Sequence, residues 1–278
     1  MNASLNIVGK TDKGKRRSKN EDVFVVDSTL GFMLVADGMG GHNSGDVASR
    51  LAAQICTEQL RRSLQTGHVP IFYHVPANPN LDPRSLILGD CIKFSNQAVY
   101  EAAQSNPANH NMGTTLVAAL WLENKLAIAH VGDSRLYLVQ NGKLIQCTVD
   151  HSFVQEQVDR GFIKPEEAEK SDFKNMLTRS IGVHEDVAVD VQEKTLEVGD
   201  YILLCSDGLT KMIDDDQILA VFKLHKDLGK IVEELIKRAN DAGGGDNITT
   251  VVAQVEGAAL GSLTNRVMNV FSKKGSKG

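Results

Sequence analysis

The order of strand-like and helix-like segments is the feature that most constrains the fold of this chain. Two short apolar segments, 22–27 and 31–36, are predicted strands, and two long patterns with helical spacing follow at 44–64 and 83–104. Strand patterns return from residue 114 onwards, and two more helical patterns and one strand come after them. Because strands and helices are grouped rather than strictly alternating, we predict an α+β fold with antiparallel sheets and helices packed outside them.

The later segments complete this pattern. Predicted strands cover 114–122, 125–131, 135–140, 143–146, 187–195, 200–205 and 248–255, and predicted helices cover 215–223 and 227–242. Asn141-Gly142 separates two of these strands and is a strong signal for a two-residue hairpin turn. Residues 150–185 are polar with only short helical pieces, as expected of a segment that leaves the sheet and often carries function.

Composition argues against several classes of protein. The net charge of −5 gives no global reason to expect binding to nucleic acid or to a membrane surface. No apolar run approaches the roughly 18 residues of a membrane span, and the N-terminal residues lack the apolar core of a signal peptide. The four cysteines are widely spaced, which favours reduced thiols in a cytoplasmic protein over disulfides or a zinc site. Residues 257–278 are basic, and we expect a flexible tail there.

Aspartates beside glycine recur where predicted strands begin or end. Asp37 follows the apolar run 31–36 and precedes the glycine-rich segment 38–41. The same arrangement occurs at Gly132-Asp133, Asp207-Gly208 and Gly245-Asp246. Glu21 and Asp22 add two more acids at the start of a predicted strand.

Each of these aspartates, taken alone, fits an ordinary turn, where Asp-Gly and Gly-Asp pairs are common. Clustered carboxylates, in contrast, repel one another, and each raises the pKa of its neighbours unless a cation neutralises them. Carboxylate oxygens are hard ligands that select Mg²⁺ or Mn²⁺ over Zn²⁺. If the strand ends converge in space, the sequence predicts a site for divalent metal ions at one edge of the sheets.

Six short motifs carry a resemblance to a known family. They are RSKNED (17–22), VADGMGG (35–41), GTT (113–115), HVGDSRLYL (130–138), LCSDGL (204–209) and GGDNIT (244–249). In this order and at these spacings, over about residues 6–256, they resemble the metal-dependent Ser/Thr protein phosphatases of type 2C, and the DGMGGH form is similar to the bacterial branch. The resemblance implies a four-layer α-β-β-α sandwich, with one phosphatase domain at 1–256 and a mobile flap at about 150–185.

The resemblance also implies a cluster of two metal ions, Mn²⁺ or Mg²⁺, at one edge of the sandwich. Asp37 would bridge both ions, and the backbone carbonyl of Gly38 would complete one coordination shell. Asp207 and Asp246 would ligate the second ion. Together with Arg17, these three aspartates are the predicted catalytic residues.

Three further acids and one departure complete the implied centre. Glu21 and Asp22 would hold metal-bound waters, and Asp133 would help to form a third, weaker metal site. Met39 departs from the pattern of many eukaryotic members, which have a histidine at this position that is proposed as a general acid. Protonation of the leaving group would then fall to a metal-bound water or to another residue such as His42.

A phosphate group needs a donor outside the metals. Arg17 fits the family position and offers the bidentate fork that suits phosphate, and Arg179, which borders the flap, is a second candidate for contact with substrate. Cys56 and Arg62 have the spacing of a cysteine-dependent phosphatase, but they lie in a predicted helix without a phosphate-binding loop, so we reject that chemistry. His130 lies within an apolar strand and is predicted to be a packed histidine.

Three functions follow from these observations. The first is a phosphatase that hydrolyses phosphoserine and phosphothreonine in proteins through in-line attack by a metal-bridged water, reversing a Ser/Thr kinase. The second is a catalytically weak relative that binds phosphoproteins as a regulator, and the presence of every expected acid favours the enzyme. The third, a two-metal nuclease, would require a broader basic surface. We expect phosphorylated proteins as partners, no nucleic acid, and a monomer.

Overall fold

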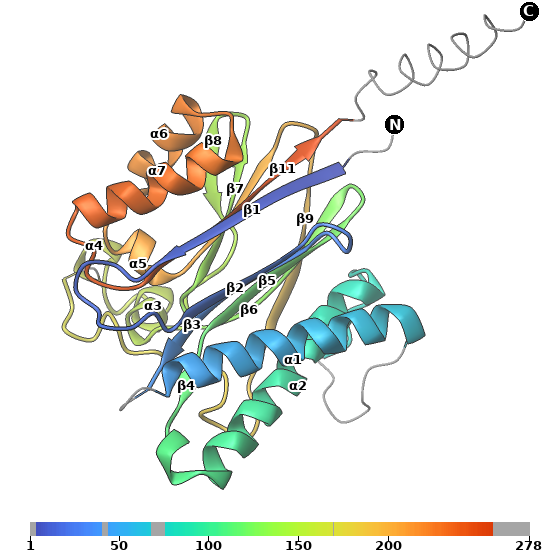
Figure 1. Cartoon of the computed structure of the whole chain (residues 1–278), viewed down its shortest axis with the longest axis vertical. Coiled ribbons are helices and arrows are strands. Elements are labelled where there is room, and N and C mark those ends of the chain that lie inside the picture. Colours follow the sequence, from blue (N-terminus) through green and yellow to red (C-terminus); the bar gives the residue numbers. More distant parts are fainter. Residues whose placement is uncertain (1–3, 41–43, 68–75, 169, 258–278) are drawn as a thin grey trace, which may run out of the picture.

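The computed structural model describes residues 4–40, 44–67, 76–168 and 170–257. Within these ranges two antiparallel sheets face each other, and helices cover the outer face of each sheet (Figure 1). This arrangement of layers confirms the predicted α-β-β-α sandwich. No helix in the described ranges is long and apolar enough to cross a membrane.

The first sheet has five strands in the order β1-β11-β10-β7-β8. Their bounds are β1 (Ser4–Asp12), β7 (Arg135–Gln140), β8 (Lys143–Gln146), β10 (Tyr201–Cys205) and β11 (Ile248–Glu256). β1 pairs with β11 along its whole length, from Ser4 opposite Glu256 to Asp12 opposite Ile248. The turn between β7 and β8 is the predicted hairpin, because Asn141 and Gly142 have positive φ angles of 51° and 72°.

The second sheet has the order β2-β3-β5-β6-β9, with the short strand β4 paired to the end of β3. Its strands are β2 (Asp22–Asp27), β3 (Phe32–Met39), β4 (Gly113–Thr114), β5 (Leu116–Leu122), β6 (Lys125–Val131) and β9 (Asp190–Thr195). The predicted hairpin of the first two apolar segments is confirmed as β2 and β3.

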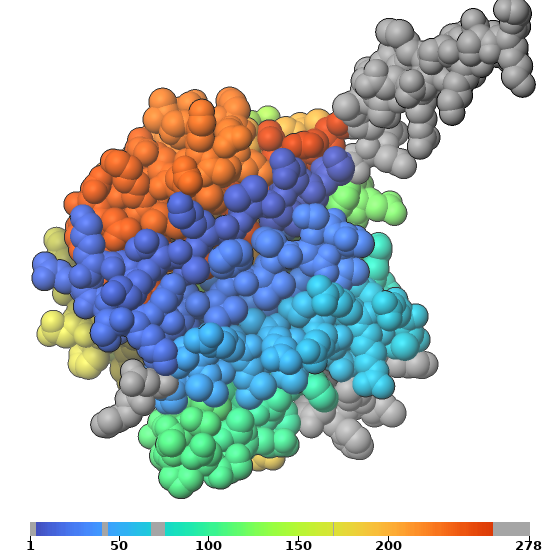
Figure 2. Space-filling view, viewed as in Figure 1, coloured from blue at the N-terminus to red at the C-terminus, as the bar shows by residue number. Residues whose placement is uncertain are grey.

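Two pairs of long helices form the outer layers. Helices α1 (Gly45–Thr66) and α2 (Pro83–Ser105) pack on the second sheet, and α6 (Asp215–Leu224) and α7 (Leu228–Asp241) pack on the first. The shorter helices are η1 (Pro107–Asn109), α3 (Phe153–Asp159), α4 (Pro165–Ala168) and α5 (Asp207–Thr210). In the space-filling view, the N-terminal segment runs across the visible face between the C-terminal helices and α1 (Figure 2).

Buried apolar side chains fill the three spaces between these layers. On β3, Met33 points into the space between the sheets and Leu34 into the space beneath α1 and α2. On β10, Leu203 packs against α6 and α7 while Leu204 faces the other sheet. Successive residues of a strand point to opposite faces, so a strand covered on both faces is apolar throughout. An aspartate at the end of such a strand is therefore a marked change of character.

Three elements of the structure were not predicted, and one of them is the short helix η1 (Pro107–Asn109). In β1, Leu5 and Ile7 alternate with polar residues, but Gly9 and Lys10 break the apolar pattern, and the strand owes its place to pairing with β11. Helix α5 is only four residues long, which is too short to show a period. The predicted strand at 114–122 is divided at Thr115 into β4 and β5.

Candidate metal centre

The hairpin of β2 and β3 brings the first two acids of the centre together. Asp22 lies directly opposite Asp37 in the antiparallel register, and side chains of directly opposed residues project from the same face. The Gly38 N–H donates to the carbonyl oxygen of Glu21 at 3.2 Å, which holds the end of the hairpin closed. A Cβ at Gly38 would lie 2.1 Å from the carbonyl oxygen of Gly45, so only glycine allows α1 to begin this close to the strand.

Asp22 is fixed from the other sheet. Its Oδ2 accepts hydrogen bonds from the hydroxyls of Ser206 and Thr249, each at 2.7 Å, while its Oδ1 is buried with no partner among the described residues. Burial, with a smaller contribution from the charges of Asp207 and Asp246, raises the pKa of Asp22 to about 6 despite these two hydrogen bonds. This carboxylate therefore joins the ends of the two sheets, and one of its oxygens has no neutralising partner in the described part of the chain.

Asp37 is the acid most affected by its neighbours. Poor hydration at the end of β3 raises its pKa well above the ordinary value, and the charges of Asp22, Asp207, Asp133 and Asp246 add to that rise. These carboxylates come from segments far apart in the sequence, and they lie close enough for their charges to raise the pKa of Asp37. The convergence expected from the strand-end aspartates is thus present in the fold.

Asp207 begins α5 directly after β10, and Lys211 forms an ion pair with its Oδ2 one turn later. Oδ1 of Asp207 is buried and, like that of Asp22, has no partner among the described residues. A Cβ at Gly208 would lie 1.9 Å from the carbonyl oxygen of Asn247, so glycine is needed for this turn to approach the start of β11.

Asn247 connects the loop before β11 to the loop that carries Arg17. Its side-chain amide donates to the carbonyl oxygens of Lys13 and Lys19 at 2.8 and 2.9 Å, and its Oδ1 accepts from the Glu21 N–H at 2.8 Å. These bonds hold the ends of the 13–21 segment beside Asp246. The GGDNIT motif was recognised in the sequence, but this role of its asparagine was not predicted, because it depends on contacts across more than 200 residues.

Arg17 lies at the rim of the acids. Its guanidinium donates to Asp246 Oδ2 at 2.7 Å, and its side chain is 53% exposed. The bond to Asp246 raises the pKa of Arg17, and the charges of Asp37 and Asp207 also favour its protonated form. Arg17 is therefore a partly solvated cation that faces the cluster.

Asp133 follows β6 and lies near enough to Asp207 to be affected by its charge. Burial raises its pKa to about 7, the charge of Asp207 adds to the rise, and the charge of Lys211 opposes it. The Glu21 backbone is held by Asn247, Gly38 and Ser49, and a Cβ at Gly45 would lie 3.0 Å from the Glu21 carboxyl carbon. Both predicted acids therefore border the same centre.

The donor set fits divalent metal ions. Asp22, Asp37 and Asp133 have raised pKa values, and Asp22 and Asp207 each present a buried oxygen without a partner in the described structure. Hard oxygen donors of this kind suit Mg²⁺ or Mn²⁺, whose charge would let all the acids ionise together.

The remaining sequence predictions lie away from these acids. Cys56 is buried within α1, where burial raises the pKa of its thiol to about 12, so it lacks the exposed, easily ionised thiol that a cysteine-dependent phosphatase needs. His130 is 2% exposed and packed in β6, as predicted. The terminal methyl carbon of Met39, Cε, lies beside Gly113. His42 lies outside the described residues.

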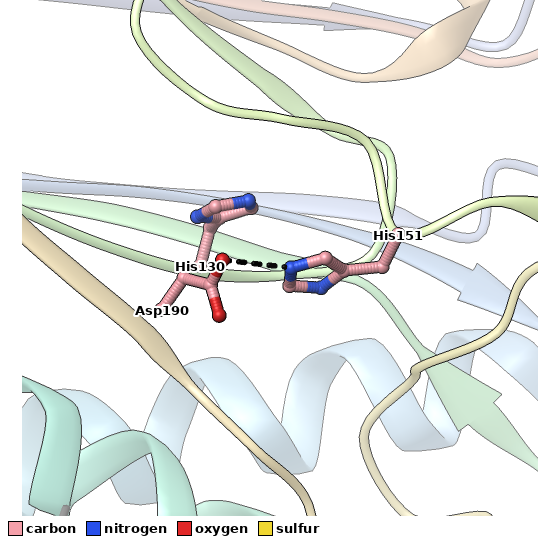
Figure 3. Close-up of side chains that lie close together, drawn as sticks. All are labelled: His130, His151 and Asp190. Atoms are coloured by element: carbon pink, nitrogen blue, oxygen red, sulfur yellow. Dashed lines mark ion pairs between the residues drawn. The ribbon is translucent and has the colours of Figure 1, made fainter. Parts of the chain in front are cut away.

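His130, His151 and Asp190 form a second cluster of polar groups, shown in Figure 3. Gly132 N–H donates to His151 Nδ1 at 3.1 Å, so the proton of the neutral ring is on Nε2, which faces Asp190 at 3.3 Å. His130 Nε2 forms a hydrogen bond of 2.9 Å with the Val149 carbonyl oxygen. The His130 ring stacks on the His151 ring, with an angle of 18° between the two ring planes. Because the two rings are stacked, their nitrogen lone pairs lie in nearly parallel planes and do not converge on one point, so this arrangement does not suit a metal ion.

Arg179 belongs to this second cluster. Its Nη1 donates to Asp190 Oδ1 at 2.8 Å and lies 3.3 Å from His151 Nε2. Backbone hydrogen bonds from Thr178 N–H to the His151 carbonyl and from Phe153 N–H to the Met176 carbonyl join the two ends of the 150–185 segment beside it. The guanidinium therefore ties together the two ends of the 150–185 segment, and contact with substrate stays a prediction for Arg179.

Comparison with known proteins agrees with this fold and centre. A family model described as protein phosphatase 2C matches residues 13–252. The serine/threonine phosphatase stp of Listeria monocytogenes is 36% identical over 248 residues, which are 88% of this chain and 94% of that protein. Protein phosphatase PhpP of Streptococcus pneumoniae is 34% identical over 251 residues, with 88% of this chain and 95% of that protein covered.

Solved structures of serine/threonine phosphatases are also similar to this chain. The serine/threonine phosphatase PstP/Ppp of Mycobacterium tuberculosis has a TM-score of 0.79 at 34% identity, covering 91% of this chain and 100% of that one. The catalytic domain of PstP in complex with two manganese ions has a TM-score of 0.77 at 33% identity, covering 92% of this chain and 100% of that one. Fold and centre together define a double-sheet sandwich with a carboxylate-rich site at one end. The chain belongs to the protein phosphatase 2C family.

Proposed function

We propose that this protein is a metal-dependent phosphatase that hydrolyses phosphoserine and phosphothreonine in other proteins. The observation that carries the proposal is the meeting of Asp22, Asp37, Asp133, Asp207 and Asp246, from separate strand ends, beside Arg17. Membership of the protein phosphatase 2C family supports the reaction, and the manganese-bound PstP domain supports Mn²⁺ as one metal that the fold can hold.

In this proposal the chain holds two divalent ions, Mn²⁺ or Mg²⁺. Asp37 and the Gly38 carbonyl would bind at the end of β3, and Asp207 and Asp246 would bind from the first sheet. When bound, the ions supply Lewis acidity, which lowers the pKa of a water and reduces the charge of a phosphate ester. The role of the aspartates is to fix these charges in place before substrate arrives.

Two further acids would act through water rather than by direct ligation. Asp22 is held rigidly by Ser206 and Thr249 and keeps one oxygen free to accept a hydrogen bond. Glu21 is held through its backbone by Asn247. Such outer groups orient the inner ligands, and their loss typically costs about 10–100-fold in metal affinity or activity.

Arg17 would bind and orient the phosphate. Its fork of N–H donors is half exposed and now donates to Asp246, so an incoming phosphate dianion can share or replace that bond. Position 39 holds a methionine instead of a histidine, and a methionine side chain cannot donate a proton to the leaving group. The proton would come from a water or from His42.

The alternative function is a regulatory relative that binds phosphoproteins without hydrolysing them. Loss of a ligand would favour it, whereas every predicted acid is present in the chain, and the charges of Asp22, Asp133, Asp207 and Asp246 all act on Asp37. We propose that residues 1–256 act as one phosphatase domain with the flap at 150–185. Residues 258–278 of the basic tail lie outside the described residues, and the cognate kinase, the monomeric state and the cytoplasmic location stay predictions.

The test is hydrolysis of a phosphothreonine peptide by chelator-treated protein with Mn²⁺ or Mg²⁺ added back. We expect activity in the wild type, none in Asp207→Asn, and full activity in Asp214→Asn. Asp214 is the N-cap of α6, outside the centre, and asparagine caps a helix equally well. Metal binding without hydrolysis in the wild type would instead favour the regulatory relative.

A further inference from the structure

Lys211 places an ammonium group inside the carboxylate centre. It follows Asp207 by one helical turn, and its Nζ forms an ion pair with Asp207 Oδ2. The backbone N–H of Lys211 also donates to the Asp207 carbonyl at 2.8 Å, which fixes the start of the side chain. Neither the motifs nor the proposed ligand set assigned a role to this residue.

The position of Lys211 differs from that of an ordinary surface pair. Lys237 and Asp241 have the same spacing on α7, but their side chains are 67% and 59% exposed, against 31% and 14% for Lys211 and Asp207. The charge of Lys237 acts mainly on Asp241 and nearby helix residues, whereas that of Lys211 acts on Asp207, Asp133 and Asp37. The chain thus directs one shielded ammonium toward its metal-binding acids.

Other acids of the centre have different partners. Asp246 is engaged by Arg17, and Asp22 by two hydroxyl groups. The charge of Asp207 raises the pKa of Asp133, and the Lys211 ammonium, which is paired with Asp207, opposes that rise. Any divalent ion bound between these two carboxylates would have to displace the ammonium from Asp207.

We propose that the Lys211 ammonium serves as a built-in cation between Asp207 and Asp133, taking the place of a third divalent ion. This inference rests on the proposed two-ion phosphatase centre. A tethered cation competes at an effective concentration on the order of millimolar, so a weakly bound third ion is excluded under ordinary conditions. The protein then needs only two divalent ions, and Lys211 is a positioning residue for Asp207.

The experiment is a calorimetric titration of the full chain with Mn²⁺, carried into the millimolar range. We expect two ions per chain in the wild type, in Lys211→Arg, which keeps the cation, and in Lys237→Met, which removes the matched exposed pair. Lys211→Met should bind a third, weaker ion, and the double variant Lys211→Met/Asp133→Asn should lose that third ion again. Circular dichroism of each variant establishes that it is folded.

The possible results separate this inference from the proposed function. Three ions in the wild type, or two in folded Lys211→Met, would overturn the role of Lys211 and leave the two-ion centre standing. Fewer than two ions in the wild type would overturn the two-ion centre itself, and the inference with it. If Lys211→Met does not fold, Lys211→Gln carries the same expectation of a third ion.

Discussion

The acid-rich end of the sandwich and the cluster of His130, His151 and Asp190 both concentrate polar side chains, yet they differ in charge balance. In the second cluster, the hydrogen bond with His151 lowers the pKa of the Asp190 carboxyl to about 2, and His130 and Arg179 contribute to that lowering. At the acid-rich end, burial and mutual repulsion raise the pKa of several carboxylates instead. Proximity of potential ligands alone therefore does not indicate a metal centre, whereas uncompensated charge on rigid oxygens without partners among the described residues supports one.

The largest expected difference between the two regions appears when one carboxylate in each is replaced by an amide. Asp37→Asn should lower phosphatase turnover by more than the roughly 10–100-fold that loss of an outer group costs, because Asp37 is a proposed direct ligand of both ions. Asp190→Asn should change turnover by less than about threefold, since its cluster is balanced by neighbouring protein groups. Steady-state kinetics at saturating Mn²⁺ measures both. Equal losses in the two variants would remove the distinction between the regions.

The two arginines offer the next comparison. Arg17→Ala should raise KM for a phosphopeptide about ten- to a hundredfold, because a charge-assisted hydrogen bond contributes about 1.5–3 kcal/mol. The affinity for Mn²⁺, measured by calorimetry, should stay nearly constant. A change confined to metal affinity would contradict the assignment of Arg17 to phosphate.

The pH dependence of stability should have opposite signs in the two regions. Asp22 has a pKa raised from 3.8 to about 6, so the folded metal-free protein binds this proton more tightly than the unfolded chain, and stability falls as the pH rises through that window. Asp190 has a pKa lowered from 3.8 to about 2, so its contribution is present above about pH 4 and is lost as the pH falls toward 2.

Denaturant unfolding of chelator-treated protein between pH 3 and 8 would measure these slopes. Asp22→Asn should flatten the decline between about pH 4 and 6, and Asp190→Asn should flatten the loss at low pH. Mn²⁺ should abolish the decline at the acid-rich end, because a bound cation favours the ionised carboxylates. An unchanged profile in Asp22→Asn would show that this acid is not the source of the decline.

Arg179→Ala gives the smallest expected effect. Its ion pair with Asp190 is half exposed, so its loss should cost no more than about 1 kcal/mol of unfolding free energy, with KM nearly unchanged. Thermal unfolding and peptide kinetics on the same sample measure the two quantities. A rise in KM comparable to that of Arg17→Ala would show that Arg179 contacts the substrate.

Much of the fold could be predicted because the strands and long helices carry clear periodic patterns. The segments 32–36 of β3 and 201–205 of β10 are continuously apolar, and Asp37 and Asp207, which follow them closely, were visible for that reason. β1 could not be predicted in the same way, since its order depends on pairing with β11, more than 230 residues later.

The centre was partly predictable on the same physical grounds. The acids could be identified from their position at strand ends, although their convergence required the fold. Asn247 and Lys211 were missed because their roles depend on a long-range loop contact and on a helix of only four residues. In general, residue type and position indicated which groups could bind metal, and the fold showed which charges are already neutralised.

The most direct test of the account is to locate Mn²⁺ in crystals of the protein by anomalous scattering. The account predicts two manganese peaks at the acid-rich end, both within coordination distance of Asp37, with the Lys211 ammonium retained beside Asp207. Manganese bound instead at His130 and Asp190, or no manganese at Asp37, would contradict it.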